Sequence, residues 1–388
     1  MSAFDVDGGG IEVDLGLTIA QVIVPLEGEA LDSATAELVD APESATALAL
    51  RAAYVPQATV PGYETAASAE YPRLVKPLDG PVLSFADQPA ESLLWPWLVD
   101  NSLDGIGTGW SLWYSTDHAA LHSDSGLFAA TAPTPLGPYT SVGRIYRDDV
   151  SGAGHQCETP SIIWNPITSL WHIYYQLAGV TGTASNQVTL MATAPAGGLL
   201  DPAQWTRYGV VIDAYDPAIP GALVHQGYLR PMRYAGGWYG WNLLGGTFGG
   251  TQQQRSMDGI SWTPAGRTAY QGPLINQSIA GFDPTTWIMK HTLCSVLEWR
   301  GRPWWIGGVT GEAAGTETAP PMALAVAPLS PTLDRITAPL KEITPPIQEW
   351  ETASAVDGLG NAARWNGRTF IPYRSLTKVG KFSIMEVI

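Results

Sequence analysis

A pattern of short segments recurs from residue 94 to the end of the chain and constrains the fold more than any other feature. Each copy begins with an apolar segment that often carries proline. It continues through an aromatic-rich segment and a segment of small residues, and a fourth segment follows a turn. Two copies contain the tetrapeptide Ala-Thr-Ala-Pro, at residues 130–133 and 192–195, which aligns them. Repeats of this size usually bury their apolar faces against one another.

The copies predict five groups of strands. The first four groups begin near residues 94, 158, 228 and 291, and a shorter fifth begins near residue 360 and lacks a fourth strand. Three or four strands in each of five units indicate an all-β protein, a five-bladed β-propeller. Residues 73–76 are expected to supply the missing outer strand and close the ring. A pair of irregular β-sandwiches is the alternative. The expected strands lie at 94–99, 110–115, 126–133 and 139–145; 158–163, 170–176, 187–195 and 205–212; 228–233, 238–243, 252–257 and 262–267; 291–297, 304–309 and 322–328; and 360–365, 369–374 and 381–388.

The composition supports a folded, turn-rich chain. Glycine (42) and proline (31) are spread along 388 residues, which suits many short strands and excludes long helices. The formal charge of −16, with no run of lysine or arginine, argues against a nucleic-acid partner. No apolar stretch is long enough for a membrane span, and no signal peptide is recognisable, so we expect cytoplasmic synthesis.

Residues 1–72 do not follow the repeat and are predicted to form an N-terminal arm, with the propeller at 73–388. The arm contains an alternating stretch at 11–15 and an apolar stretch at 18–25. It is expected to pack either on the propeller or on a protein partner.

The second and third copies resemble a known superfamily. Glu158-Thr159-Pro160-Ser161-Ile162-Ile163-Trp164, the segment 172–176 and the segment 190–195 are similar to five-bladed propeller glycosidases of the arabinanase, xylosidase and invertase type. The Ser-x-Asp-Gly-x-x-Trp turn at residues 256–262 is common in the same proteins. The resemblance covers roughly residues 90–388 and implies the propeller fold more strongly than any reaction.

The resemblance implies glycoside hydrolysis by two carboxyl groups, one acting as general acid and the other activating water or attacking the sugar. Glu158 matches the setting of the acid. The positions aligned with the superfamily's base are Leu94 and Trp95, and the third copy offers Leu229 and Arg230, so no second carboxylate falls in register. Displaced bases in loops are Asp216, Asp283 and Asp357, although each is also typical of a turn.

Other polar and aromatic residues are expected to gather at the same end of the propeller. Three histidines at the starts of inner strands lack the spacing of a metal site. The resemblance leaves calcium in the central channel open, as in some relatives, but no acidic cluster demands it, and no other cofactor is expected. The predicted ligand-binding residues are Trp95, His155, His225, Arg230, His291 and Arg364.

Three functions fit these features. The first is a carbohydrate-binding propeller on a glycosidase-like scaffold, a receptor-binding or adhesin component of a phage-like particle that recognises a poly- or oligosaccharide. The second is a glycoside hydrolase that uses Glu158 as general acid, and whether the protein is an enzyme is left open. The third is a rigid structural spacer.

Overall fold

The computed structural model describes most of the propeller and three strands near the N-terminus. The described residues are 5–7, 10–13, 22–25, 70–84, 93–116, 126–149, 157–178, 187–213, 226–243, 251–264, 273–275, 288–310, 323–333, 337–338, 341–351, 356–375 and 381–388. Their only helices are two short 3-10 turns, η3 (Asn101–Asp104) and η4 (Pro202–Gln204), and neither has the length of a membrane-spanning helix.

The chain divides into two compact units, residues 1–63 with 233–237 and residues 64–232 with 238–388. In the first unit, β1 (Asp5–Asp7), β2 (Gly10–Val13) and β3 (Val22–Pro25) form an antiparallel sheet in that order. The boundary that the sequence places at residue 72 stays a prediction.

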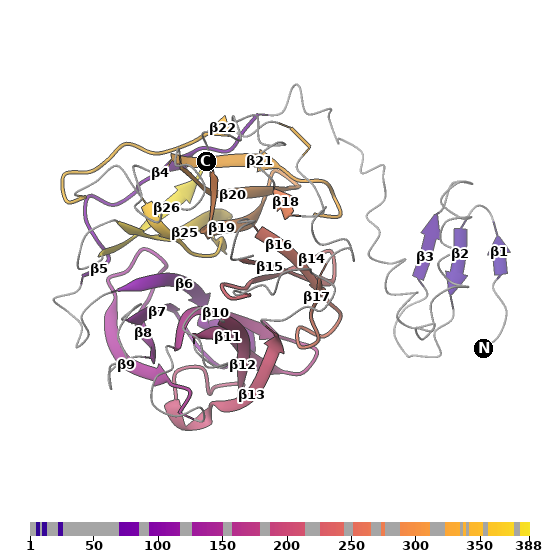
Figure 1. Ribbon diagram of the computed structural model, residues 1–388, viewed down its shortest axis with the longest axis horizontal. Coiled ribbons are helices and arrows are strands. Elements are labelled where there is room, and N and C mark those ends of the chain that lie inside the picture. Colours follow the sequence, from indigo (N-terminus) through magenta and orange to yellow (C-terminus); the bar gives the residue numbers. More distant parts are fainter. Residues whose placement is uncertain are drawn as a thin grey trace. The chain divides into compact units, whose positions relative to one another are not determined.

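The second unit is a five-bladed propeller, which confirms the predicted fold. Blades 1, 2 and 4 are four-stranded antiparallel sheets built from consecutive strands, blade 3 carries one additional strand, and blade 5 is a six-stranded sheet that includes two strands from the segment before blade 1. The colours of Figure 1 follow the blades around the ring in chain order. The strands of the first three blades are β6 (Leu94–Asp100), β7 (Trp110–Thr116), β8 (Gly126–Ala132) and β9 (Thr140–Tyr146); β10 (Cys157–Asn165), β11 (Leu170–Ala178), β12 (Gln187–Pro195) and β13 (Thr206–Ile212); and β14 (Arg230–Tyr234), β15 (Gly237–Leu243), β16 (Thr251–Ser256), β17 (Thr263–Pro264) and β18 (Pro273–Ile275).

The last two blades depart from the predicted strands in two places. Blade 4 has an outer strand that the repeat did not indicate, and the inner strand of blade 5 begins at Val356, four residues before the predicted start at 360. This inner strand is interrupted and continues as a second short strand. The strands are β19 (Ile288–Trp299), β20 (Arg302–Thr310), β21 (Ala323–Pro328) and β22 (Lys341–Glu342); and β23 (Val356–Leu359), β24 (Ala363–Trp365), β25 (Arg368–Ser375) and β26 (Lys381–Val387).

The ring closes through the segment that precedes blade 1. β4 (Leu74–Val75) pairs with β26, as expected for residues 73–76, and β5 (Leu83–Ser84) pairs with the same strand further along. At the inner side, Asn361 binds the backbone of blade 1 twice: its Oδ1 accepts from the N–H of Leu98 at 2.7 Å, and its Nδ2 donates to the Leu98 carbonyl at 2.8 Å. The side chain of Asn361 therefore makes the two hydrogen bonds that a paired backbone residue would make, and so joins the last blade to the first.

Aromatic side chains fill the space between blades. Trp113 and Trp171 are fully buried in one apolar cluster of blades 1 and 2, and Trp304 is fully buried between blades 4 and 5. Large flat rings suit this position because they fill the wedge between twisted sheets. Hydrogen bonds from side chains to the backbone of the next blade also join the blades. Trp97 Nε1 of blade 1, for example, donates to the Ile162 carbonyl of blade 2 at 2.7 Å.

Asp104 joins blades 1 and 2 at the end where β6 turns into β7. Its Oδ2 accepts from Trp171 Nε1 and from the N–H of Gly197, both at 2.8 Å. Partial burial alone would raise the pKa of this carboxyl, but hydrogen bonds from Gly107, Gly197, Trp171 and Ile106 outweigh it and lower the pKa to about 2.

We expect Asp104→Asn to lower the free energy of unfolding at neutral pH by about 1 kcal/mol, a value discounted for partial solvent screening. Because the folded pKa is depressed, this contribution is complete above about pH 4 and is lost as the pH falls toward 2. Chemical denaturation of both proteins across this range should show two curves that converge in acid. A constant difference down to pH 2 would contradict the assignment.

Candidate functional site

An unusual backbone conformation recurs at the start of three inner strands. Trp95, Thr159 and Tyr228 have φ angles of 55°, 60° and 58°, in the left-handed region that aromatic and β-branched residues avoid. In β6 and β10 a bulge falls at the same point, between Leu94 and Trp97 and between Glu158 and Ser161. Strained residues of this kind cluster at functional sites, so we name this end of the propeller the strand-head end.

Glu158 lies at the strand-head end of β10 and is fully buried, with none of its surface exposed. It stands opposite Gln176 of β11, whose Nε2 donates to Glu158 Oε1 at 2.5 Å. The other amide atom, Gln176 Oε1, accepts from the backbone N–H of Tyr228 at 3.1 Å. Gln176 thereby connects the carboxyl of blade 2 to the strained residue of blade 3.

Two aromatic contacts continue this connection. The rings of Trp95 and Tyr228 meet edge to face, with centroids 5.3 Å apart, and Leu94 packs beside them. The guanidinium carbon of Arg230 lies 5.5 Å from the ring centroid of Trp97. Trp95 is 6% exposed and Arg230 is 3% exposed, so both are buried, and we call this buried group of side chains at the strand-head end the floor.

Small polar groups complete the floor. Ser115 Oγ donates to the Leu94 carbonyl and accepts from the N–H of Thr159, both at 3.4 Å, and Thr189 Oγ1 donates to the Gln226 carbonyl at 2.7 Å. Carboxyl, amide, hydroxyl and guanidinium groups therefore stand beside aromatic rings. These groups are buried and are bonded to one another or to the backbone, so they support the strand-head end from beneath.

The structure connects some of the residues predicted from the sequence. Trp95 is linked to Glu158 through Tyr228 and Gln176, and Arg230 belongs to the inner strand that follows Tyr228. His155 and His225 lie outside the described residues, as do Asp216 and Asp283. His291 lies in a wide bulge of β19, between Lys290 and Ser295, and Asp357 is the bulge residue between Val356 and Gly358 of β23.

Arg364 lies elsewhere. It stands in β24 opposite Thr369, one residue before the strand's end, and is exposed. The register of blade 5 places it along the inner strand where Trp164 lies in blade 2, away from the strand heads. The reason is that the inner strand of blade 5 begins at Val356, earlier than the repeat indicated.

Gln176 is the principal residue that the sequence did not single out. Its importance comes from standing opposite Glu158, and that pairing depends on a bulge that shifts the register of β10 by one residue. The signal for Gln176 would have been its position directly opposite Glu158 on the neighbouring strand. The sequence does not reveal that position, because it depends on the register.

The arrangement of the connections distinguishes the two ends of the propeller. At the far end the first and second strands of blades 2 to 5 are joined by short turns, at residues 166–169, 235–236, 300–301 and 366–367. At the strand-head end the second and third strands of blades 1 to 4 are joined by longer segments, 117–125, 179–186, 244–250 and 311–322. Long connections on a rigid scaffold are where binding residues concentrate.

Comparisons with known proteins agree on the scaffold. No protein-family model and no curated protein matches the sequence. Among solved structures, a glycosyl hydrolase from Bacteroides ovatus superposes with a TM-score of 0.53 at 13% identity, covering 82% of this chain and 94% of the other.

Two further structures give the same result. The catalytic domain of the GH62 α-L-arabinofuranosidase from Coprinopsis cinerea has a TM-score of 0.50 at 11% identity, covering 81% of this chain and 96% of the other. A structure described in work on the GH130 family of mannoside phosphorylases has a TM-score of 0.51 at 15% identity, covering 85% and 95%. The chain therefore has the five-bladed propeller scaffold found in glycoside hydrolases, and identities this low show the fold alone.

Proposed function

We propose that this protein is a carbohydrate-binding propeller whose strand-head end receives a poly- or oligosaccharide. The observation that supports this proposal most directly is the state of Glu158, which is buried and bonded to Gln176 within the scaffold. Hydrolysis in the usual manner requires a second carboxyl about 5–10 Å away. Within the described part of blades 1 and 3, the strand heads carry Trp95, Trp97 and Arg230 in its place.

The N-terminal unit fits the role of an attachment segment. It is compact by itself and contains its own three-stranded sheet. We propose that it joins the propeller to a larger, phage-like assembly, in which the propeller is the receptor-binding or adhesin component. This part of the proposal rests on analogy with multidomain binding proteins.

A glycan array of neutral and acidic oligosaccharides, followed by calorimetry on the strongest ligand, tests the proposal. Because Arg230 is buried beside Trp97, we expect Arg230→Met to act indirectly, by disturbing the packing beneath the ligand, and to weaken binding at least about tenfold, equivalent to about 1.4 kcal/mol. Arg364→Met is the matched control, because that arginine is exposed in β24, away from the strand heads, and should leave the affinity unchanged. The fold of each variant is checked by circular dichroism.

Glu158→Gln separates binding from hydrolysis. The substituted amide oxygen can still accept from Gln176, so a binding protein should keep its affinity within about threefold, close to the experimental error in free energy. If the unaltered protein releases sugar from the same ligand and Glu158→Gln abolishes this release, the protein is a glycoside hydrolase with Glu158 as general acid. Absence of any glycan binding would favour a structural spacer.

A further inference from the structure

The segment of residues 70–84, here called the strap, is held at both ends by very short strands. Val75 and Leu74 of β4 pair with Glu386 and Val387, while Leu83 and Ser84 of β5 pair with Phe382 and Lys381. At one end the backbones of Arg73 and Ile388 exchange two hydrogen bonds of 2.9 Å. Two paired residues at each end specify a register weakly, because a slip by one residue sacrifices few ladder bonds.

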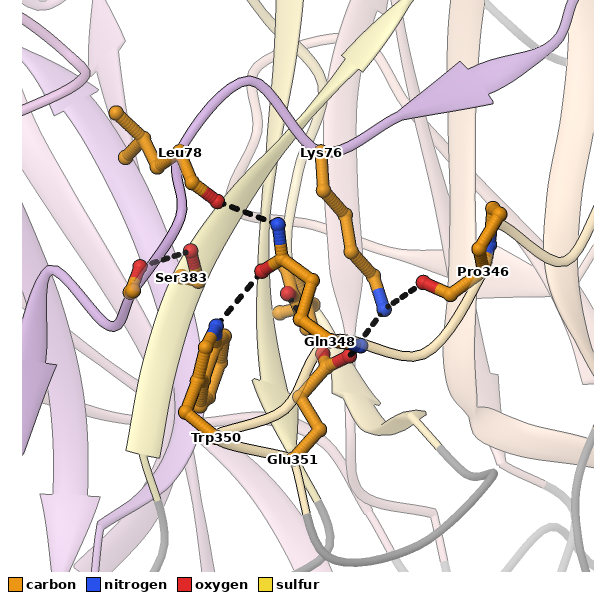
Figure 2. A network of polar contacts seen from close by, with 9 residues as sticks. Lys76, Leu78, Pro346, Gln348, Trp350, Glu351 and Ser383 are labelled. Atoms are coloured by element: carbon orange, nitrogen blue, oxygen red, sulfur yellow. Dashed lines mark hydrogen bonds and ion pairs between the residues drawn. The ribbon is translucent and has the colours of Figure 1, made fainter.

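In the middle of the strap, hydrogen bonds from side chains to strap carbonyls take the place of backbone strand pairing (Figure 2). Gln348 Nε2 donates to the Leu78 carbonyl at 2.6 Å, and Ser383 Oγ donates to the Gly80 carbonyl at 3.1 Å. Gln348 belongs to the connector between blades 4 and 5, whereas Ser383 lies in β26. The strap is therefore fastened to two separate parts of the propeller.

A buried ion pair lies between these fastenings. Lys76 Nζ is 2.5 Å from Glu351 Oε2, and the two side chains are only 7% and 4% exposed. The ammonium also donates to the Pro346 carbonyl at 2.9 Å (Figure 2). It lies 5.5 Å from the ring centroid of Tyr373. Both charges are thus withdrawn from water and satisfied by neighbours of fixed position.

The carboxylate of Glu351 is itself fixed in place. Its Oε2 accepts from the backbone N–H of Gln348 at 2.7 Å, and its Oε1 accepts from the hydroxyl of Tyr373 at 2.8 Å. Any other register of the strap would move Lys76 away and leave a buried charge without its counterion, which is strongly unfavourable. The ion pair can therefore select one register where the short strands cannot.

We propose that the Lys76–Glu351 pair is a latch that sets the register of the strap on β26, and that breaking it opens the strap by itself, ahead of the five blades. The strap also carries the covalent link from the N-terminal unit. While the strap is closed, a force applied to that unit acts on the pairing between the strap and β26 of blade 5. Once the strap is open, the same force acts on the start of blade 1. The latch is thus a conformational device at the point where the chain enters the propeller.

Native-state hydrogen exchange on the full chain tests this inference. The reporters are the amides of Arg73, Val82 and Ile388, whose hydrogen bonds join the strap to β26, and the reference is the amide of Ile173 in blade 2. We expect Lys76→Met and Glu351→Gln each to accelerate exchange at the reporters at least about 100-fold relative to the reference. Arg368→Met, which breaks the more exposed pair with Glu386 in the same blade, should change the ratio less than about threefold.

The double variant Lys76→Met with Glu351→Gln separates register from simple stability. It removes both charges and keeps one amide oxygen, which can accept from the N–H of Gln348, while the amide NH2 can donate to the Tyr373 hydroxyl, so the reference amide should be as protected as in the unaltered protein. A latch predicts that the reporters still exchange fast in this variant. The proposal is wrong if the reporters regain slow exchange in the double variant. It is also wrong if the single variants lose protection equally in all blades, or if exchange at the reporters does not change in the single variants.

Discussion

Replacing Gln176 with leucine is expected to lower the free energy of unfolding by about 3–5 kcal/mol. The substitution removes the Nε2 donor that Glu158 uses and the Oε1 acceptor that the N–H of Tyr228 uses, both in a buried region. Leucine has a similar volume, so little of the loss comes from a cavity. Urea denaturation at neutral pH, with the slope of the transition compared between variants, measures the change.

Gln204→Leu is the matched control. Gln204 is exposed in η4, and the same substitution there should change the free energy of unfolding by less than about 0.5 kcal/mol. The proposed function adds a second readout, since Gln176→Leu should also weaken glycan binding in the fraction that stays folded. If Gln176→Leu costs no more than Gln204→Leu, the amide does not join blades 2 and 3 in the way described.

If the proposed function holds, the connection through Gln176 gives Glu158 a structural role that does not depend on hydrolysis. In the proposed binding protein the carboxyl of Glu158 orients an amide, and the amide in turn holds the left-handed backbone of Tyr228. The edge of the Tyr228 ring then meets Trp95 of blade 1. Three blades thus meet at the floor through one continuous set of contacts, in which the side chain of Glu158 has a structural role that a glutamine could also fill.

The blade strands were predictable from the sequence because their periodic residues are the ones that pack. Trp113, Trp171 and the alanines of the Ala-Thr-Ala-Pro segments repeat along the chain for the same reason that they are buried in the structure. The outer strand β4 was also predictable, because an incomplete fifth copy needs a partner and the chain before residue 94 is the nearest source.

The remaining features depend on register and on contacts between distant residues. Val356-Asp357-Gly358 lacks the proline and aromatic pattern of other strand heads, so the early start of blade 5 and the position of Arg364 were missed. Gln176 gains its role only from a bulge. Lys76 and Glu351 are 275 positions apart, and neither stands in a recognisable motif.

His172 is expected to make the propeller lose stability in mild acid. The ring is fully buried, hydrogen-bonds to Asn165, Thr168 and Tyr174, and stacks on Trp238 with centroids 6.2 Å apart. Burial lowers its pKa from 6.5 to about 4, while the Gly259 carbonyl and the charge of Asp258 oppose the shift only partly.

The sign of the effect follows from where protons bind. With a folded pKa below the unfolded value, the unfolded chain takes up a proton first as the pH falls below about 6.5, so the free energy of unfolding decreases until about pH 4. A shift of this size corresponds to about 3 kcal/mol. Urea denaturation at pH 7, 6, 5 and 4.5 should show this decline, above the window in which Asp104 contributes its own loss.

His172→Gln provides the decisive comparison, because glutamine offers polar atoms near the same partners and does not titrate. The variant will be less stable than the unaltered protein at pH 7, since it loses the stacked ring. Its free energy of unfolding should nevertheless change little between pH 6.5 and 4.5, so the two curves approach each other in acid. Parallel curves would assign the acid sensitivity to other groups and would mean that the buried imidazole accepts its proton as readily in the folded propeller as in the unfolded chain.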